Sequence, residues 1–296
     1  MSETNVLVTG HLGQLGSDLM ERLSPSFNMS GVDIDTLDIT DKPAVMRYIE
    51  KLQPDIVIHA AAYTDVDGCE TNAALAMQVN DDGTANVAEA CRNVGAHMIY
   101  YSTDYVFDGN TETPYIETDS PNPQTVYGQS KLAGEEAVRK ILDDYTILRI
   151  AWVYGKSGKN FVKTMLRLAQ IQLETRRRDE TAKPLTVVDD QIGNPTWTVD
   201  IVRQTQAVID RKLDGLYHST SEGPCSWYRF ASDIFEIAGL DVDLKPCTTA
   251  EFPRPAQRPA MSALENRNLK EAGANVMRHY RTALQEFLTT NKGLMS

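Results

Sequence analysis

The sequence predicts an α/β protein built on a doubly wound parallel sheet, with a smaller and less regular region behind it. First, short apolar runs alternate with segments of helical spacing over about the first 150 residues, which is the pattern of βαβ units. Second, the first apolar run ends in a glycine-rich turn that leads directly into the first helical segment. Because crossovers between parallel strands are almost always right-handed, such units place helices on both faces of one sheet.

The elements follow in order along the chain. We expect strands at residues 6–8, 29–33, 56–60, 97–102 and 146–150, and helices at 18–23, 44–52, 73–94 and 127–141. The breaks between them carry helix-ending residues, namely Pro25, Gln53-Pro54 and Gly95. The alternation therefore predicts five parallel strands in the first half of the chain.

The regular alternation of short apolar runs and helical segments ends after Trp152. We expect a helix at 161–173, a charged loop at 176–183, a strand at 185–188 and a helix at 198–209. Four prolines between positions 246 and 259 exclude a regular helix there and predict an extended segment. We assign residues 1–150 plus about 185–218 to a nucleotide-binding domain of the Rossmann type, and about 151–184 plus 219–296 to a smaller mixed α/β region that binds the substrate.

Composition excludes several classes of protein. The 296 residues carry a net charge of −12, which argues against binding to nucleic-acid phosphates. No apolar run approaches the roughly 20 residues that span a bilayer, and the first residues do not form a signal peptide. The four cysteines and five histidines are scattered, so we expect reduced thiols, a cytoplasmic location and no metal site of cysteine or histidine type.

The glycine turn contains Gly10, Gly13 and Gly16. Glycines at this spacing allow a tight turn and let a pyrophosphate approach the first turn of the following helix, although a bare turn without a ligand stays an alternative. Asp33 ends the second strand, 23 residues after Gly10, where a carboxylate accepts hydrogen bonds from a ribose diol. A carboxylate at this position repels a 2′-phosphate and therefore favours NADH. A protonated His11 would offset this repulsion, so NADPH stays an alternative cofactor.

Two residues after the second strand have two open interpretations. Asp38 and Ile39 either border the adenine of the nucleotide or form a capping turn before Lys42-Pro43.

Tyr127 and Lys131 form the expected chemical centre. They are four residues apart, so a helix places both side chains on one face. A free tyrosine titrates near pH 10, and a neighbouring ammonium lowers that value, so the phenol can donate a proton to a ketone oxygen as a hydride reaches the carbon. Thr103, at the end of the fourth strand, is either a third polar group on that oxygen or a simple turn residue.

Several longer segments resemble one family, the dTDP-4-dehydrorhamnose reductases, within the extended short-chain dehydrogenase/reductases. The resemblance runs from Val6 to about Leu269 and is carried by residues 59–67, 101–109, 126–135, 148–155 and 189–196, together with Arg258-Pro259, Ser262 and Leu264.

This resemblance implies reduction of the C4 ketone of dTDP-6-deoxy-L-lyxo-4-hexulose to dTDP-L-rhamnose with NADH or NADPH. It assigns catalysis to Thr103, Tyr127 and Lys131. It assigns the cofactor groove to Gly10, Gly13, Gln14, Leu15, Ala60, Ala61, Ala62 and Asn80. The full set of expected cofactor-binding residues also includes His11, Gly16, Asp33, Asp38, Ile39, Tyr63, Tyr127 and Lys131. The resemblance assigns the sugar site to Val66, Ser102, Thr103, Asp104, Tyr105, Phe107 and Trp152, and Arg258 to the diphosphate, unless Arg258 forms a structural ion pair.

Other points stay open at this stage. The charged stretch from Arg176 to Glu180 either reaches a diphosphate or is a solvated loop. Some family members dimerise through magnesium held by glutamates, and Asp18 stands where such a glutamate would be, so Mg²⁺ is possible but not supported and the protein is a monomer or a homodimer. The alternatives are another nucleotide-sugar 4-ketoreductase, an epimerase, or a regulatory subunit of methionine adenosyltransferase.

Overall fold

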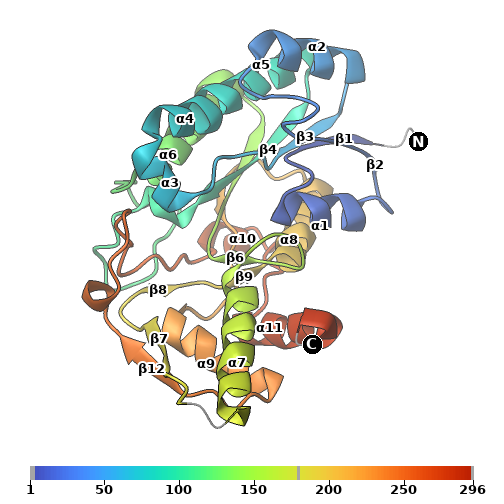
Figure 1. The fold of residues 1–296 in the computed structure, drawn as a ribbon. Helices are drawn as coiled ribbons and strands as arrows, with labels where there is room; N and C mark the ends of the chain where they lie inside the picture. The colour runs from blue at the N-terminus through green and yellow to red at the C-terminus, as the bar shows by residue number, and fades with distance from the viewer. Residues whose placement is uncertain (1–3, 179–180, 295–296) are drawn as a thin grey trace.

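The computed structural model describes residues 4–178 and 181–294 and is centred on a six-stranded parallel sheet (Figure 1). Its strand order is β2-β1-β3-β4-β5-β10. The strands are β2 (Asn28–Val32), β1 (Asn5–Thr9), β3 (Ile56–His59), β4 (His97–Thr103), β5 (Tyr145–Ile150) and β10 (Gly215–His218). The chain leaves β1 toward β2 and then returns to β3 on the other side of β1, so a crevice opens at the carboxyl ends of β1 and β3.

Helices cover both faces of this sheet, as the doubly wound prediction requires. One face packs against α2 (Lys42–Leu52), α5 (Gly83–Val94) and α6 (Val126–Ile141). The other face packs against α1 (Gln14–Leu23), α8 (Thr198–Arg211) and α10 (Arg267–Glu271). Strand residues alternate between these layers: Leu7 and Val57 face the first, and Val8 and Ile58 the second.

The expected helix at 73–94 is a helical run with a local change of pitch. It consists of α4 (Ala73–Met77), a π-helical turn at Gln78–Asp82, and α5. A short helix, α3 (Val66–Thr71), precedes it. The π turn brings Asn80 into the interior, where its side chain is fully buried.

A second, smaller region follows, seen in the lower half of Figure 1. Its core lies between α7 (Phe161–Arg177), α9 (Trp227–Ala238) and α11 (Tyr280–Thr290). Three pairs of short strands surround it: β7 (Leu185–Val188) with β12 (Leu244–Cys247), β6 (Val153–Tyr154) with β9 (Thr196–Trp197), and β8 (Ile192–Gly193) with β11 (Cys225–Ser226). The sequence-based division assigns residues 185–218 to the nucleotide-binding domain. In the structure, β7, β8 and β9 from this stretch lie around the smaller core, whereas α8 packs on the large sheet and β10 joins it.

Two sequence-based boundaries were wrong. Helix α1 begins at Gln14, four residues early, because the glycine turn itself forms the start of the helix. Helix α7 runs to Arg177, so Arg176 and Arg177 are not in a loop. Two cationic side chains suit the last turn of a helix, and the Arg176 guanidinium also donates to the Asp241 carbonyl oxygen at 2.9 Å. Asp179 and Glu180 lie outside the described residues.

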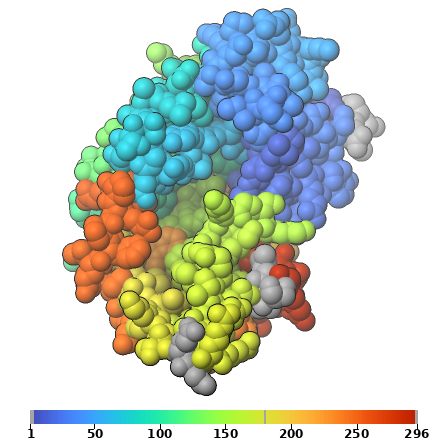
Figure 2. Space-filling model, viewed as in Figure 1, coloured from blue at the N-terminus to red at the C-terminus, as the bar shows by residue number. Residues whose placement is uncertain are grey.

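The proline-rich segment is largely irregular, as expected. It begins inside β12, continues through the 3₁₀ turn Thr249–Glu251, and then crosses toward α3 of the large region. Figure 2 shows the surface hollowed between the two regions, and the segment borders this hollow.

Candidate active site

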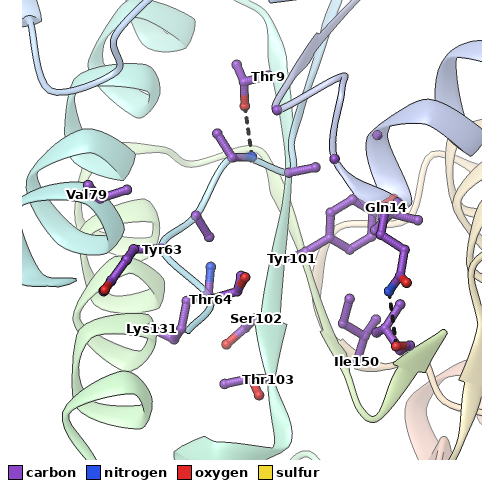
Figure 3. Close-up of a pocket in the computed structure, with 18 of the residues that line it drawn as sticks. Thr9, Gln14, Tyr63, Thr64, Val79, Tyr101, Ser102, Thr103, Lys131 and Ile150 are labelled. Atoms are coloured by element: carbon purple, nitrogen blue, oxygen red, sulfur yellow. Dashed lines mark hydrogen bonds between the residues drawn. The ribbon is translucent and has the colours of Figure 1, made fainter. Parts of the chain in front are cut away.

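A cleft of about 840 Å³ lies at the carboxyl ends of the parallel strands. Its walls come from the loops after β1, β2, β3, β4 and β5 and from one face of α6 (Figure 3). Of the candidate residues, those that line it are Gly10, Gly13, Gln14, Leu15, Gly16, Asp33, Asp38, Ile39, Ala60, Ala61, Ala62, Tyr63, Val66, Ser102, Thr103, Asp104, Tyr105, Tyr127, Lys131 and Trp152. The structure therefore gathers most of the sequence-predicted site into one space.

The glycine turn forms one end of the cleft. Gly10 has a φ of 71°, and a Cβ added there would lie 2.7 Å from the Ala61 nitrogen. A Cβ on Gly16 would collide with the Gly10 carbonyl oxygen. Gly13 is the N-cap of α1 and makes no side-chain capping bond. The first-turn N–H groups of α1 are therefore without a side-chain cap beside the cleft, where they suit a phosphate group.

The acid after β2 lies across this turn. The two carboxylate oxygens of Asp33 accept hydrogen bonds from the backbone nitrogens of Leu12, at 3.0 Å, and Ile34, at 2.9 Å. Asp38 accepts from both the nitrogen and the hydroxyl of Thr40, so it caps a turn as well as lining the cleft. Both interpretations of Asp38 are thus compatible with its position.

Two expected cofactor residues contribute indirectly. The imidazole ring of His11 packs against Gly31 of β2. A Cβ added to Gly31 would lie 2.7 Å from Cγ of His11. Asn80 binds the loop that carries the alanines: its side chain accepts from the Tyr63 nitrogen at 2.8 Å and donates to the Tyr63 carbonyl at 3.0 Å. It also bonds the hydroxyl of Ser130 on α6 at 2.9 Å. Asn80 therefore shapes one wall of the cleft from behind.

Tyr127 and Lys131 project from the first two turns of α6 into the cleft. Thr125 starts this helix, because its hydroxyl accepts from the Gly128 nitrogen at 3.1 Å. Lys131 is 3% exposed, and its Nζ lies 4.1 Å from the centroid of the Tyr100 ring. The spacing of four residues thus places both side chains on one face, as expected.

Thr103 ends β4 beside this pair. Its hydroxyl donates to the Asp104 carboxylate at 3.0 Å and accepts from the Tyr105 nitrogen at 3.2 Å. The Thr103 hydroxyl also works against the rise in the pKa of the Tyr127 phenol. Thr103 is therefore part of the polar group around Tyr127, as well as a turn residue.

Burial controls the protonation of these groups. It lowers the pKa of Lys131 to about 7, against the opposing charge of Glu135. It raises the pKa of Tyr127 well above its usual range, and it raises that of Asp104 to about 6. The expectation that Lys131 lowers the pKa of Tyr127 is thus wrong for this structure, because burial disfavours the charged forms of both groups.

Two expected sugar-site residues lie away from the cleft. Phe107 is 2% exposed and stacks on Tyr115, with ring centroids 4.1 Å apart. Arg258 forms an ion pair with Asp67 at 3.0 Å and lies 5.8 Å from the Tyr105 ring. In this structure, therefore, Phe107 is part of the interior and Arg258 is in the ion pair that the sequence left as its alternative.

The possible metal position is also interior. Asp18 is 5% exposed and accepts a hydrogen bond from the Thr198 hydroxyl, where α1 packs against α8. Its carboxylate therefore joins two helices of one chain.

The sequence reasoning missed several residues of the cleft, of which Trp227 is the most distant from the others along the chain. Trp227, at the start of α9, lines the cleft although it is 75 residues from Trp152 along the chain. No motif surrounds it, and only the tertiary arrangement brings it to the site.

The fold and this site together define the class of the protein. A parallel doubly wound sheet, a glycine turn at its switch point and a Tyr-x-x-x-Lys pair on the facing helix are the features of a short-chain dehydrogenase/reductase. No helix among the described residues is long and apolar enough to cross a membrane.

Comparison with known proteins identifies the family. The chain belongs to the family described as the RmlD substrate binding domain, whose model matches residues 4–292. It is 42% identical over 287 residues to a dTDP-4-dehydrorhamnose reductase of Mycobacterium tuberculosis, covering 94% of this chain and 90% of that protein. It is 37% identical to a dTDP-4-keto-6-deoxy-D-glucose reductase of Streptomyces niveus, covering 95% of each chain.

A solved relative extends the likeness to three dimensions. The dTDP-4-dehydrorhamnose reductase of Bacillus anthracis, solved in complex with NADP, superimposes with a TM-score of 0.92 at 39% identity. The match covers 98% of this chain and 100% of that one. The predicted fold class and the predicted family are both confirmed.

Proposed function

We propose that this protein reduces the C4 ketone of dTDP-6-deoxy-L-lyxo-4-hexulose to give dTDP-L-rhamnose, with NADPH or NADH as the reductant. The observation that carries the proposal is the meeting of Thr103, Tyr127 and Lys131 in the cleft that begins at the glycine turn. The names of the relatives supply the sugar, and the B. anthracis complex supports a nicotinamide cofactor.

The residues of the cleft fit such a cofactor. The turn at Gly10 and Gly16 leaves no room for side chains, and the start of α1 presents backbone N–H groups to a pyrophosphate. Ala60, Ala61 and Ala62 are small, so the loop after β3 leaves a flat apolar wall for a planar ring. When bound, the nicotinamide supplies the hydride that reaches C4 of the sugar.

The proton comes from the chain. Tyr127 would donate its phenolic proton to the ketone oxygen, and burial, which raises the pKa of the phenol, keeps it protonated until the reaction. Thr103 donates a hydrogen bond to the same oxygen when its hydroxyl turns from Asp104. Lys131, when protonated, would stabilise the oxygen anion that Tyr127 leaves, and it would hold the ribose hydroxyls of the nicotinamide half when the cofactor is bound.

The carboxylate of Asp33 favours NADH over NADPH. It already accepts two backbone hydrogen bonds, so its negative charge is fixed in place beside the glycine turn. A 2′-phosphate at that position would meet this charge at close range, whereas a 2′-hydroxyl would donate to it.

The remaining expectations stay predictions. The four cysteines are free thiols, which supports a cytoplasmic location. The protein would act as a monomer or a homodimer on a small-molecule nucleotide sugar, without nucleic acid or membrane. The burial of Asp18 gives no support to a magnesium site at that residue.

The proposal is tested by offering the purified protein the 4-keto-L-sugar with NADH or NADPH and following the loss of nicotinamide absorbance. Formation of dTDP-L-rhamnose, identified by its mass and its retention on anion exchange, is the expected result. The S. niveus relative makes a second 4-ketoreductase substrate reasonable, so dTDP-4-keto-6-deoxy-D-glucose is tested in parallel. Faster turnover of the D-sugar would contradict the proposed substrate, and conversion without net oxidation of the cofactor would indicate an epimerase.

A further inference from the structure

The ammonium group of Lys131 lies against the face of an aromatic ring. Its Nζ is 4.1 Å from the centroid of the Tyr100 ring, which belongs to β4 and is fully buried. Within the described part of the chain, this Nζ forms no hydrogen bond and no ion pair. The ring face is therefore the partner that the folded chain offers to this buried charge.

The carboxylate one helical turn after Lys131 is bound by other residues. Glu135 is fully buried, and its two oxygens each accept a hydrogen bond of 2.8 Å from the guanidinium of Arg149. One of these oxygens also accepts from Arg139 at 2.9 Å. The charge of Glu135 raises the pKa of Lys131, but this effect is smaller than that of burial. Glu135 therefore acts on Lys131 without forming an ion pair with it.

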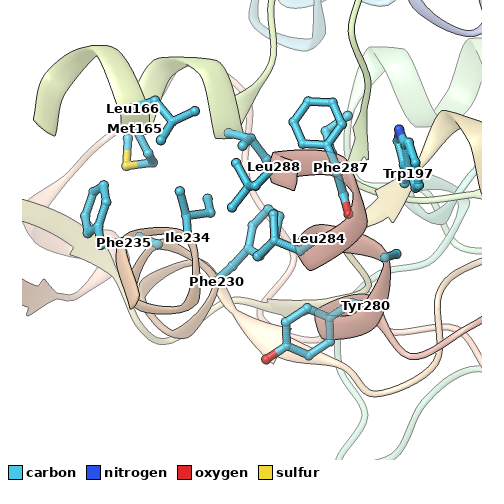
Figure 4. Packing of buried hydrophobic residues seen from close by; sticks show 14 of the residues in the cluster. Met165, Leu166, Trp197, Phe230, Ile234, Phe235, Tyr280, Leu284, Phe287 and Leu288 are labelled. Atoms are coloured by element: carbon cyan, nitrogen blue, oxygen red, sulfur yellow. The ribbon is translucent and has the colours of Figure 1, made fainter. Parts of the chain in front are cut away.

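A second cation over a ring has a different set of partners. Arg278 lies 5.8 Å from the ring centroid of Trp197, a residue in the core of the smaller region (Figure 4). It also forms ion pairs with Asp200 at 2.7 Å and Glu286 at 2.5 Å. Lys131 has the ring without a paired carboxylate, so loss of the ring would leave its charge without a neighbouring partner.

Neighbouring elements hold Tyr100 in place. Its hydroxyl donates to the carbonyl oxygen of Lys131 at 3.2 Å, which joins the ring to the helix that carries the lysine. A Cβ added to Gly134 would collide with this hydroxyl, so α6 lies directly against the ring. The His59 ring, on β3, stacks on Tyr100 with centroids 5.8 Å apart and planes 20° apart. The Tyr100 ring is therefore fixed in position beside Nζ.

The two stacked rings are uncharged. Burial lowers the pKa of His59 to about 3, and it raises that of Tyr100 well above its usual range. Further titratable groups close to Tyr100 are Glu135 and Tyr127 on α6 and Asp81 on the π turn. Burial also lowers the pKa of Lys131, to about 7. Of the lysine and the two rings, only the lysine therefore changes its charge near neutral pH.

We propose that Tyr100 is a positioning residue that holds the Lys131 ammonium by a cation–π contact, so that this ammonium stays protonated and directed into the cleft. The inference rests on the proposed function for the role of Lys131 beside Tyr127 and the cofactor. A ring face attracts a cation without accepting a conventional hydrogen bond, so the N–H groups that point away from the ring stay available for the ribose hydroxyls. A carboxylate in the same place would bind those N–H groups itself.

The test measures the titration of Lys131 by NMR of protein labelled at lysine Cε, in which the Lys131 signal is the one lost in Lys131→Met. Tyr100→Leu removes the ring and should lower the titration midpoint by about one pH unit, which is a tenfold change in proton affinity. Tyr100→Phe keeps the ring and should stay within about 0.3 unit of the wild type. Met98→Ala is the matched control, because Met98 is equally buried on the same face of β4, and it should also stay within about 0.3 unit.

A second series keeps the test decisive if Tyr100→Leu does not fold. Phenylalanines of increasing fluorination at position 100 keep the shape of the ring and withdraw electron density from its face, which weakens its attraction for a cation. The midpoint of Lys131 should fall with each step of fluorination. A midpoint that stays constant along this series, or in a folded Tyr100→Leu, would overturn the proposal.

The pH profile of kcat/KM connects the contact to the reaction, because kcat/KM reports the protonation of the free enzyme. In Tyr100→Leu, kcat/KM should fall about tenfold at pH 8 but only about twofold at pH 6, where the lysine is still largely protonated. A general loss of structure would lower both values alike, and an NMR shift without this pH-dependent loss would contradict the proposal.

The two proposals fail separately. A wild type that turns over no 4-keto sugar would contradict the proposed function, while the NMR midpoints would still decide whether Tyr100 holds the Lys131 ammonium. Turnover with the same midpoint in the wild type and in the fluorinated series would contradict only the role of Tyr100.

Discussion

Replacing Lys131 with methionine should stabilise the protein while it removes activity. Burial lowers the pKa of this lysine from its usual 10.5 to about 7, and the side chain is only 3% exposed. This difference in pKa corresponds to a destabilisation of about 5 kcal/mol when the buried lysine is fully charged. At pH 7 the folded-state lysine is only partly protonated, so the destabilisation is about 4 kcal/mol. Methionine has a similar length and carries no charge, so the Lys131→Met variant should have the higher free energy of unfolding by up to about that amount.

The pH dependence gives the sharper measurement. The pKa is lower in the folded state, so the unfolded chain binds more protons between about pH 7 and pH 10.5, and the stability of the wild type rises with pH across that window. The advantage of Lys131→Met should therefore shrink by about 2 kcal/mol between pH 7 and pH 9.

Urea unfolding at the two pH values measures this advantage, with Lys140→Met as the control. Lys140 lies on the same helix and is exposed, so its replacement should change stability by less than about 1 kcal/mol, with no such pH dependence. If Lys131→Met is no more stable than the wild type at pH 7, or if its advantage is the same at both pH values, the burial argument is refuted.

Three further predictions concern the other groups of the cleft. Tyr127→Phe should reduce turnover by about 10²- to 10⁴-fold and leave cofactor Kd nearly unchanged, measured by stopped-flow reduction and fluorescence titration; full turnover would remove the phenol from the mechanism. Asp33→Ala should raise kcat/KM for NADPH relative to NADH, and an unchanged ratio would exclude Asp33 from cofactor selection. Because burial raises the pKa of Asp104 to about 6, its folded form binds more protons between about pH 4 and pH 6. Asp104→Asn should therefore stabilise the protein more at pH 7 than at pH 5, by about 1 kcal/mol in urea unfolding, and an equal effect at both would contradict the shift.

The fold and the shared position of Tyr127 and Lys131 in the cleft were predictable because both follow from local patterns. The strands β1, β3 and β4 are buried on both faces. Their sequences are therefore continuous apolar runs, which predict strands of a parallel sheet. The spacing of Tyr127 and Lys131 determines a shared helix face whatever the rest of the chain does.

What the sequence did not show depends on contacts between distant segments. Trp227 reaches the cleft because it directly follows β11, which pairs with β8. His11 turns away because Gly31 of the neighbouring strand leaves space for its ring. The π turn at Asn80 places that side chain under the alanine loop, and helical periodicity cannot distinguish it from an uninterrupted helix.

The pKa values of the catalytic pair give a consistent account of when the proton moves. Burial favours the neutral phenol of Tyr127 and lowers the pKa of Lys131 toward neutrality, so the site disfavours a phenolate in advance of the reaction. A reductase needs this order of events, because a proton held on the phenol is available when negative charge develops on the ketone oxygen. That developing charge is a far stronger base than the ketone, and a cationic Lys131 would then stabilise the phenolate that is left. Burial therefore keeps the proton on Tyr127 before the reaction, and the turnover of Tyr127→Phe tests whether this proton reaches the ketone oxygen.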